Sequence, residues 1–124
     1  MVLDAWAILA LLTNEPAAGR VRSLIVEGEA AICAVNLGEV LYSLIRTIGR
    51  EFADERVAGV RQVVQVIGVD WPLIELAAET KAEGGLSYAD AFCVATARAR
   101  GSALATGDPE ILALADQLEV VDLR

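Results

Sequence analysis

The stretch "LSYADAFCVATARARGSALATGDPE", residues 86–110, predicts a helix that leads directly into a buried strand. Apolar residues recur at helical spacing over residues 88–100, and Gly101 separates them from the short apolar run "SALAT" at 102–106. Helices of this length between short apolar strands are typical of βαβ units, in which the strands run parallel and helices cover both faces of the sheet.

The rest of the chain repeats this alternation of short apolar runs with longer helical patterns. Further strands are expected at "MVL" (1–3), "AAICAV" (30–35), "VVQVIGV" (63–69) and "LEVVDL" (118–123), and helices at 16–28, 37–49, 53–65, 73–84, 88–100 and 109–117. We therefore predict an α/β fold with one domain, residues 1–124, built as a three-layer α/β/α sandwich around a parallel sheet of about five strands. In such sheets, ligands bind at the carboxyl ends of the strands, where the following helices begin.

The composition restricts the chemistry that is open to this chain. Hydrophobic residues make up 56% of the 124 residues, but no run approaches the roughly 18 that a membrane span needs. The N-terminus lacks the basic region of a signal peptide and carries Asp4, so we expect a soluble, cytoplasmic protein. Histidine is absent, which excludes Ser-His and Cys-His catalysis and Cys/His zinc sites, and both cysteines sit among apolar neighbours as buried thiols would. Carboxylates remain, and their oxygens suit hard cations such as Mg²⁺ or Mn²⁺.

Four acidic residues stand at predicted junctions between strands and helices. They are Asp4 after the first strand, Glu39 at the start of the helix after "AICAVN", Asp90 in the first turn of the helix at 88–100, and Asp108 after "SALAT". Because parallel strands end along one edge of a sheet, these carboxylates are candidates for a single electronegative cleft. Such a cleft needs a cation to be stable.

Each acid also has a simpler explanation as a helix cap. Residues 36–39 have the spacing of a capping box and residues 87–90 that of a variant, with Asp in the third helical position. Asp108 stands directly before Pro109, as an N-cap residue commonly does, and Asp4 would cap a short helix that starts at Ala5. Capping alone therefore accounts for any one of the four acids.

Asp90 is the acid that capping explains least well. At helical spacing it shares a stripe with four residues that are all apolar, namely Leu86, Cys93, Val94 and Ala97. This stripe should face the core, where an ionised carboxylate requires pairing, protonation or a metal. A divalent cation would explain both its place in the first turn and its place on the apolar stripe.

The same residues resemble a known family. The segments "VLDAWAILALL…EPAA", "AICAVNLGEVLYSLIR" and "LSYADAFCVATARARGSALATGDPE" are similar, in this order and over nearly the whole chain, to the PIN-domain nucleases. More narrowly they resemble the VapC-type toxins of bacterial type II toxin–antitoxin pairs. The resemblance implies an α/β/α sandwich that cuts RNA with Mg²⁺ or Mn²⁺, forms a homodimer and is held inactive by a cognate antitoxin protein. It also implies that the catalytic, metal-binding acids are Asp4, Glu39, Asp90 and Asp108.

The resemblance suggests a role for each of these acids in cleaving a phosphodiester bond. Asp4 and Asp90 are expected to be the primary metal ligands, with Asp108 completing the metal shell. Glu39 is expected to bind a second ion or to orient the attacking water. Metals held in this way activate water and stabilise the charge that develops on the phosphate.

Three positions affect the strength of this expectation. Thr106, in "TGD", keeps the hydroxyl of the family pattern and is a candidate to support the site. Ala5 and Trp6 depart from the pattern, because family members commonly carry a serine or threonine directly after the first Asp and often another small polar residue next. The loss of an orienting hydroxyl can lower affinity or activity about 10–100-fold.

An enzyme that cuts RNA must also attract phosphate, and the net charge of −8 does not favour this. On the predicted helix from Leu37, Arg46 and Arg50 continue the stripe of Glu39 at helical spacing, which makes them candidate phosphate contacts. An ordinary solvated helix face explains these two arginines equally well. Trp6 and Trp71 are interpreted as packing residues.

Two other classes of protein stay open. One is a PIN-like scaffold without turnover, which binds RNA or a protein partner and uses the acids only as caps; Ala5 leaves this class open. The other is a phosphoacceptor receiver domain with Asp70 at a strand end. It fits poorly, because paired acids after the first strand are missing and Lys81 is the only lysine. If an antitoxin binds, the helices at 37–49 and 53–65 are expected to form a groove for its amphipathic helix.

Overall fold

Five short parallel strands form the centre of the structure, a computed structural model that describes residues 1–124. The strands are β1 (Val2–Leu3), β2 (Ala31–Cys33), β3 (Gln65–Ile67), β4 (Leu104–Thr106) and β5 (Val120–Asp122). They pair in the order β3-β2-β1-β4-β5, and every pair is parallel. The predicted α/β fold with a parallel sheet of five strands is confirmed.

Seven helices connect and cover these strands. They are α1 (Ala5–Leu12), α2 (Ala18–Val26), α3 (Ala34–Ile48), α4 (Arg50–Val63), α5 (Trp71–Ala82), α6 (Tyr88–Arg100) and α7 (Pro109–Leu112). The helix predicted at 109–117 is too long, because α7 ends after one turn and residues 113–117 continue as turns. None of the helices combines the length and apolar character that crossing a membrane requires.

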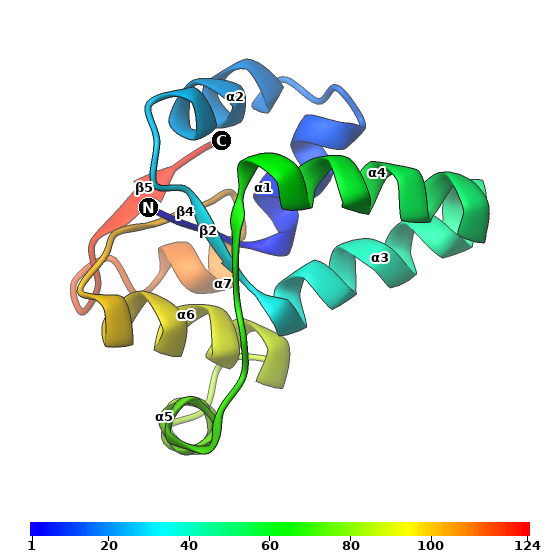
Figure 1. Ribbon diagram of the computed structural model, residues 1–124. Coiled ribbons are helices and arrows are strands. Elements are labelled where there is room, and N and C mark those ends of the chain that lie inside the picture. The colour runs from blue at the N-terminus through cyan, green and yellow to red at the C-terminus, as the bar shows by residue number, and fades with distance from the viewer.

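Side chains alternate between the two faces of the sheet, as the two-residue period of a strand requires. Leu3, Ile32 and Ala105 belong to one large core cluster, together with buried residues of α1 to α4. Val2 and Leu104 point to the opposite face and pack with residues of α6 and α7. Figure 1 shows α1, α2 and α4 above the sheet and α5 and α6 below it, so the predicted three layers are present.

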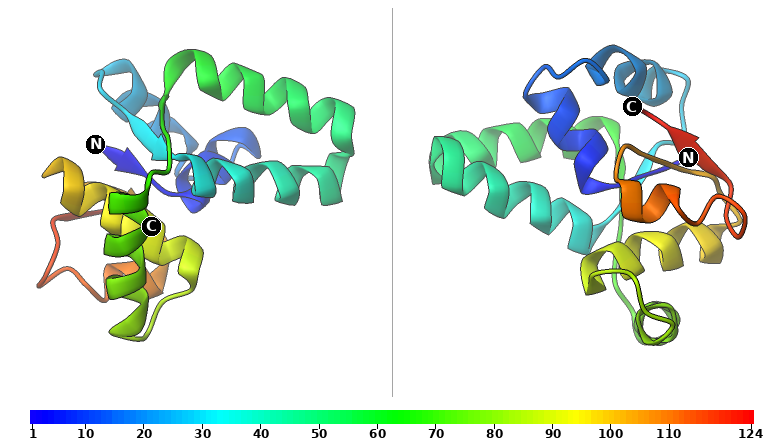
Figure 2. Two further views of the ribbon diagram at one scale, coloured as in Figure 1. Left: turned by 60° about the horizontal axis from the view of Figure 1, so that its bottom comes forward. Right: turned by 180° about the vertical axis from the view of Figure 1, so that it is seen from behind.

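Helices α3 and α4 form a hairpin that projects away from the sheet, as both views in Figure 2 show. Gly49 joins them with φ 83°, a left-handed backbone conformation that glycine adopts without steric cost. Because α3 ends at Ile48, Arg50 is the first residue of α4. The prediction that Arg50 continues the helical stripe of Glu39 and Arg46 is therefore wrong.

The order of the strands creates a crevice between β1 and β4. The chain runs outward from β1 through β2 to β3 and then returns to β4 on the other side of β1. In α/β sheets, the carboxyl ends of the two strands that flank such a reversal are where ligands bind. Asp4 directly follows β1 and Thr106 ends β4, so the topology brings these two side chains to the same edge.

Candidate metal centre

Asp4 is the most deeply buried acid at this edge, with only 3% of its surface exposed. Its Oδ1 accepts a hydrogen bond from the backbone N–H of Ala7 at 2.8 Å, so the predicted cap of α1 is present. Its Oδ2 accepts a second hydrogen bond from the hydroxyl of Thr106. Both carboxylate oxygens of Asp4 are thus held in fixed directions by a helix start and a strand end.

Burial raises the pKa of Asp4 from the usual 3.8 to about 7. The hydrogen bonds from Thr106 and Ala7 lower it, but the loss of hydration outweighs them, and the negative charges of Asp108 and Asp90 raise it further. A carboxyl with such a pKa carries a partial charge near neutral pH, and a nearby cation would complete its ionisation.

Asp90 lies in the first turn of α6, and its backbone N–H donates to the hydroxyl of Ser87 at 3.1 Å. The predicted stripe is confirmed, because Cys93, Val94 and Ala97 are buried while Asp90 itself is half-buried. Burial raises the pKa of Asp90 to about 6, helped by nearby negative charges. Asp90 is therefore both a residue of the capped first turn and an acid in contact with the core, as its sequence position indicated.

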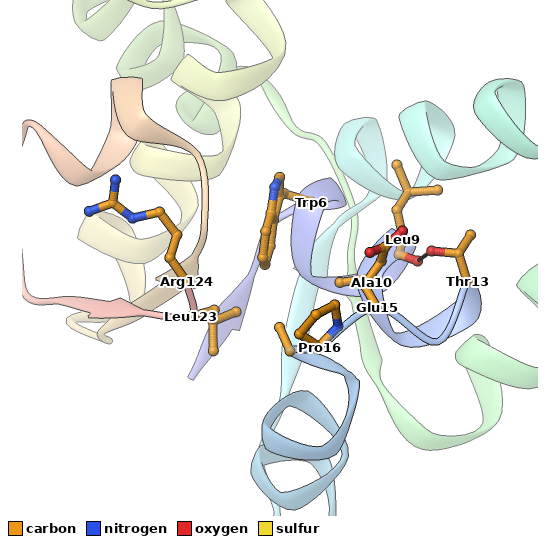
Figure 3. Close-up of a pocket in the computed structure, with 9 residues that line it drawn as sticks. Trp6, Leu9, Ala10, Thr13, Glu15, Pro16, Leu123 and Arg124 are labelled. Carbon is orange, nitrogen blue, oxygen red and sulfur yellow. Dashed lines mark hydrogen bonds between the residues drawn. The ribbon is translucent and has the colours of Figure 1, made fainter.

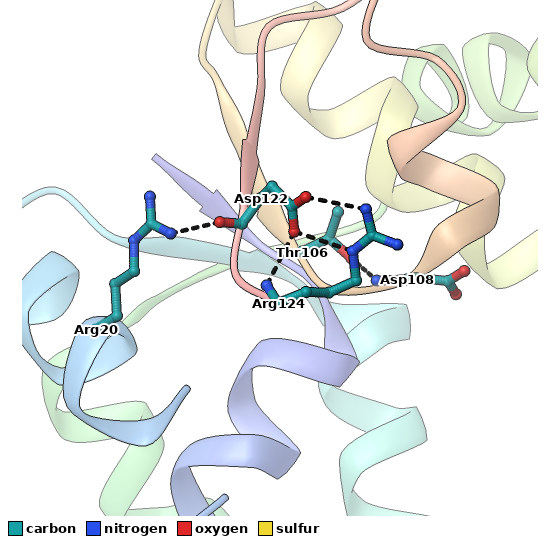
Figure 4. Close-up of polar contacts among 5 residues, drawn as sticks. All are labelled: Arg20, Thr106, Asp108, Asp122 and Arg124. Carbon is teal, nitrogen blue, oxygen red and sulfur yellow. Dashed lines mark hydrogen bonds and ion pairs between the residues drawn. The ribbon is translucent and has the colours of Figure 1, made fainter. Parts of the chain in front are cut away.

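Asp108 and Thr106 lie on the β4 side of the crevice. The backbone N–H of Asp108 donates to the Thr106 hydroxyl at 2.8 Å, which Figure 4 shows, and Asp108 Oδ1 caps α7 by accepting from the N–H of Glu110 at 2.8 Å. The single hydroxyl of Thr106 therefore links Asp4 to the backbone of Asp108. The predicted cap at Asp108 and the predicted place of Thr106 beside Asp4 are both present.

Glu39 approaches the crevice from α3, but not as the sequence predicted. The capping box at 36–39 is wrong, because β2 ends at Cys33 and α3 already begins at Ala34, so Asn36 lies inside the helix. The Asn36 side chain instead donates to Glu39 Oε1 at 2.9 Å. Glu39 is thus in the second turn of α3, with its carboxylate held from its own helix.

Glu110 is an acid near the site that sequence reasoning missed. The charges of Asp108, Glu39 and Glu110 all raise the pKa of Asp90. The signal in the sequence was its position two residues after Asp108, in the first turn of the helix that Asp108 caps. Its side chain is exposed, so it adds negative potential at the mouth of the crevice.

The pKa values of these acids show that their charges interact, but their side chains are not arranged as a metal site. Their charges act on one another across the crevice, yet no three His, Cys, Asp or Glu side chains surround one point as metal ligands do. Each oxygen of Asp4 accepts one hydrogen bond and keeps a lone pair that a metal could use. The donor chemistry fits Mg²⁺ or Mn²⁺, since every available ligand atom is an oxygen.

The two cysteines do not add ligands to this set. Both Cys33 and Cys93 are buried and free, as predicted. Burial raises the pKa of the Cys93 thiol well above its usual value, and the charges of Asp4 and Asp90 add to this effect. Because metals bind the thiolate rather than the thiol, Cys93 stays a packing residue.

Trp6 fills the space beside the Thr106–Asp108 turn. A Cβ added at Gly107 would lie 2.4 Å from two ring carbons of Trp6, so the indole rests directly against the glycine backbone. Trp6 also packs on the larger core cluster, which confirms its predicted packing role. Trp6, which departs from the family pattern, thus packs against Gly107, the residue that directly follows β4.

A cavity beside Trp6 holds none of the acids discussed above. It measures about 460 Å³ and is mostly apolar. Figure 3 shows Trp6 standing between the C-terminal Leu123 and Arg124 on one side and residues of α1 and the following turn, such as Leu9, on the other. The apolar lining of this cavity suits contact with other apolar groups, whereas the acids lie in the crevice between β1 and β4.

The predicted phosphate contacts, Arg46 and Arg50, and the second tryptophan, Trp71, make no hydrogen bond to the four acids. Arg46 is exposed, with its guanidinium 6.0 Å from the ring centroid of Tyr42, and Arg50 pairs with Asp54 at 2.9 Å. Trp71 is 67% exposed, so its predicted packing role is wrong. It occupies the first position of α5, where the side chain points outward from the helix start.

One further acid at a strand end has a different environment. Asp122 ends β5 and pairs with Arg124 at 3.0 Å (Figure 4). This contact lowers the pKa of Asp122. Arg20 binds the backbone carbonyl of the same residue. Asp122 therefore has arginine partners, whereas for Asp4 and Asp90 the neighbouring charges are carboxylates.

Comparison with known proteins assigns the family. The sequence matches the PIN domain over residues 1–117, so the chain belongs to the PIN domain family, as its motifs indicated. No curated protein gives a significant match in sequence.

Solved structures share the fold at low sequence identity. DNA-bound VapBC from Salmonella typhimurium superposes with a TM-score of 0.79 at 17% identity, over 99% of this chain and 97% of that one. A toxin–antitoxin complex from Klebsiella pneumoniae gives 0.76 at 18% identity, over 99% and 97%. VapC20 from Mycobacterium tuberculosis, described as a toxin that cleaves the sarcin-ricin loop, gives 0.71 at 25% identity, over 90% and 92%. The fold of this chain is therefore PIN-like, with VapC structures among its neighbours.

Proposed function

We propose that this protein is a Mg²⁺- or Mn²⁺-dependent endoribonuclease and the toxin of a cytoplasmic toxin–antitoxin pair. The observation that carries the proposal is the pair of acids Asp4 and Asp90, whose pKa values burial raises to about 7 and about 6 while other carboxylates face them. Keeping such charges together is unfavourable unless a cation binds them. Similar structures described as a toxin–antitoxin complex and as a sarcin-ricin loop cleaving toxin support the reaction class.

Each acid has a proposed task. Asp4 and Asp90 are the primary ligands, Asp108 completes the set, and Glu39 orients the attacking water or holds a second ion. When bound, the divalent cation lowers the pKa of water and stabilises negative charge on the phosphate. Thr106 keeps the carboxylate of Asp4 directed by donating to its Oδ2.

Arg46 and Arg50 are the proposed phosphate contacts on the hairpin of α3 and α4. Both side chains are exposed, and the ion pair of Arg50 with Asp54 lies on the surface, where such pairs contribute only about 0–1 kcal/mol. A phosphate can therefore replace Asp54 at little cost. Neutralising either arginine should weaken RNA binding without changing metal binding.

The proposed partners are a cognate antitoxin protein and a second copy of the chain. Helices α3 and α4 form the hairpin on which an antitoxin groove was predicted, and Tyr42, Ile48 and Phe52 are exposed apolar residues near its tip. Apolar side chains of this kind are what an amphipathic helix covers on binding. Co-expression with the product of any small open reading frame directly upstream of this chain's gene tests this, and two proteins that purify separately would refute it.

The decisive test of the activity compares two Asp→Asn variants. The parent should cleave structured RNA with Mg²⁺ or Mn²⁺ and stop in EDTA, and Asp90→Asn should abolish cleavage while the protein stays folded. The matched control is Asp122→Asn, which removes an acid of the same type at another strand end and should leave cleavage intact. If Asp90→Asn cuts RNA as fast as the parent, the site assignment is wrong.

A second function is favoured by the capping contacts. Asp4 and Asp108 both cap helices, and no three acids surround one point, as expected of a scaffold that binds RNA or protein without turnover. Thermal unfolding with and without Mn²⁺ separates the two functions. A metal at 100 times its Kd should stabilise the nuclease by about 2.7 kcal/mol, whereas the scaffold should show no change.

A further inference from the structure

Asn36 connects two elements of the candidate site through one side-chain amide. Its Nδ2 donates to Glu39 Oε1 at 2.9 Å and to the backbone carbonyl of Ala89 at 2.9 Å. Ala89 directly precedes Asp90 in the first turn of α6. A single buried NH₂ group therefore ties the carboxylate of Glu39 on α3 to the turn that carries Asp90.

This arrangement costs stability, which indicates that its purpose is not stability alone. Asn36 is 99% buried, and its carbonyl oxygen Oδ1 is buried without any hydrogen-bond donor. An orphaned buried acceptor costs about 1–3 kcal/mol, and such groups in folded proteins call for a specific explanation. An apolar residue of similar size would fill the same volume without this cost.

The chemistry of the two acceptors explains why the position holds an amide. The NH₂ group supplies two donors from a single atom, one for Glu39 Oε1 and one for the Ala89 carbonyl, whose oxygen has a second lone pair beside the one used within α6. Aspartate has the same shape but no donor when ionised, and it would add another negative charge. A hydroxyl carries only one proton and cannot donate to both oxygens.

We infer that Asn36 is a positioning residue that sets the direction of the Glu39 carboxylate relative to Asp90, so that both face one divalent cation. The inference rests on the proposed metal-dependent function and names a residue that acts on the cation only through Glu39 and the α6 turn. Residues of this kind, which orient ligands from behind, commonly change metal affinity about 10–100-fold when removed.

The test measures Mn²⁺ binding to the full chain by calorimetry in a double-mutant cycle. Asn36→Leu keeps the size of the side chain but removes both hydrogen-bond donors. Glu39→Gln removes the negative charge of the acceptor. We expect each variant to weaken Mn²⁺ binding and the double variant to be no weaker than Glu39→Gln alone, because the two residues act through the same contact. Losses that multiply in the double variant, or an Asn36→Leu variant that binds like the parent, would overturn the inference.

A matched control separates this effect from general loss of a buried polar group. Thr96 is fully buried on α6, and its hydroxyl donates only to the Phe92 carbonyl at 2.7 Å. Thr96→Val should leave Mn²⁺ affinity unchanged even if it lowers stability. Should Asn36→Leu not fold, Asn36→Ala removes the same donors and is evaluated in the same cycle.

NMR of the metal-free protein tests the contacts of Asn36 independently of the proposed metal-dependent function. Glu39→Gln should shift the side-chain ¹H–¹⁵N signals of Asn36, and Asn36→Leu should shift the backbone amide signals of Ala89 and Asp90. If the parent binds no Mn²⁺ but these signals shift, the proposed function fails and the positioning contact stands. If the signals do not move, the positioning role is wrong whatever metal the protein binds.

Discussion

Replacing Asp4 with asparagine tests the electrostatics of the site directly. The change keeps the size of the side chain and an oxygen to accept the hydrogen bond from Ala7, and it removes the charge. The Thr106 hydroxyl can rotate to accept from the new amide. In the metal-free protein, the main consequence should be that position 4 no longer has to ionise inside the fold.

The size of the effect follows from the pKa. Folding raises the pKa of Asp4 from 3.8 to about 7, a difference of about three pH units, and each unit is worth about 1.4 kcal/mol. Because the folded state binds this proton more tightly than the unfolded state, the stabilisation is fully present below pH 3.8 and is lost as the pH rises through 7. Asp4 therefore lowers the stability of the parent at pH 8 by about 4 kcal/mol relative to pH 3.8.

Urea unfolding of parent and Asp4→Asn in EDTA, from pH 4 to pH 8, measures this difference. The two proteins should have similar stability near pH 4, and the variant should be the more stable one at pH 8, by up to about 4 kcal/mol. Subtracting the two curves removes the titration of all acids that do not interact with Asp4, and leaves that of Asp4 together with its coupling to Asp90 and Asp108. Asp122→Asn is the matched control: because pairing with Arg124 lowers the pKa of Asp122 below 3.8, this pair's contribution is complete by pH 4, and the difference between parent and Asp122→Asn should stay constant up to pH 8. A stability difference between parent and Asp4→Asn that does not change with pH would refute the reasoning.

Three further outcomes follow from the same structure. Mn²⁺ affinity, measured by calorimetry, should weaken roughly tenfold per pH unit below pH 7, because Asp4 must lose its proton to bind; an affinity that stays constant from pH 5.5 to pH 8 would contradict this. Thr106→Val should destabilise the protein in urea by about 1–3 kcal/mol, since both the Asp4 carboxylate and the Asp108 N–H lose their partner, and it should also weaken Mn²⁺ binding at neutral pH because the hydrogen bond from Thr106 lowers the pKa of Asp4. Gly107→Ala should cost about 1–3 kcal/mol through overlap with the Trp6 ring, and the cost should shrink in a Trp6→Leu background; equal costs in both backgrounds would show that Trp6 does not cause the strain.

Local patterns of the sequence were sufficient for the class of fold and for most of the helix caps around the candidate site. Short apolar runs between helical patterns predict parallel strands, since only a strand buried on both faces tolerates an uninterrupted apolar run. The caps at Asp4, Ser87 and Asp108 were also predictable, because a cap depends on residues within one turn of it. The apolar stripe around Asp90 depends only on helical spacing, and the structure confirms it.

The sequence analysis was wrong where the exact start or end of a helix decides which residues meet. Reading "AICAVN" as a strand made residues 36–39 a capping box, but the chain becomes helical at Ala34. Asn36 then faces inward, where its amide reaches the Ala89 carbonyl 53 residues away. Likewise Gly49 ends α3 before Arg50, a break that helical spacing alone does not reveal.

The sequence by itself determined that this chain is an α/β protein of the PIN family, and it singled out four carboxylates as candidates for its chemistry. Residue types and local periodicity carry that information, because each acid, cap and strand is defined by its near neighbours. Only the tertiary structure decided how these acids affect one another. Desolvation of Asp4, its contact with Thr106 and the tie from Asn36 to α6 all join residues distant in sequence. A pKa near 7 for an aspartate is a property of the packed crevice between β1 and β4, and no local pattern contains it.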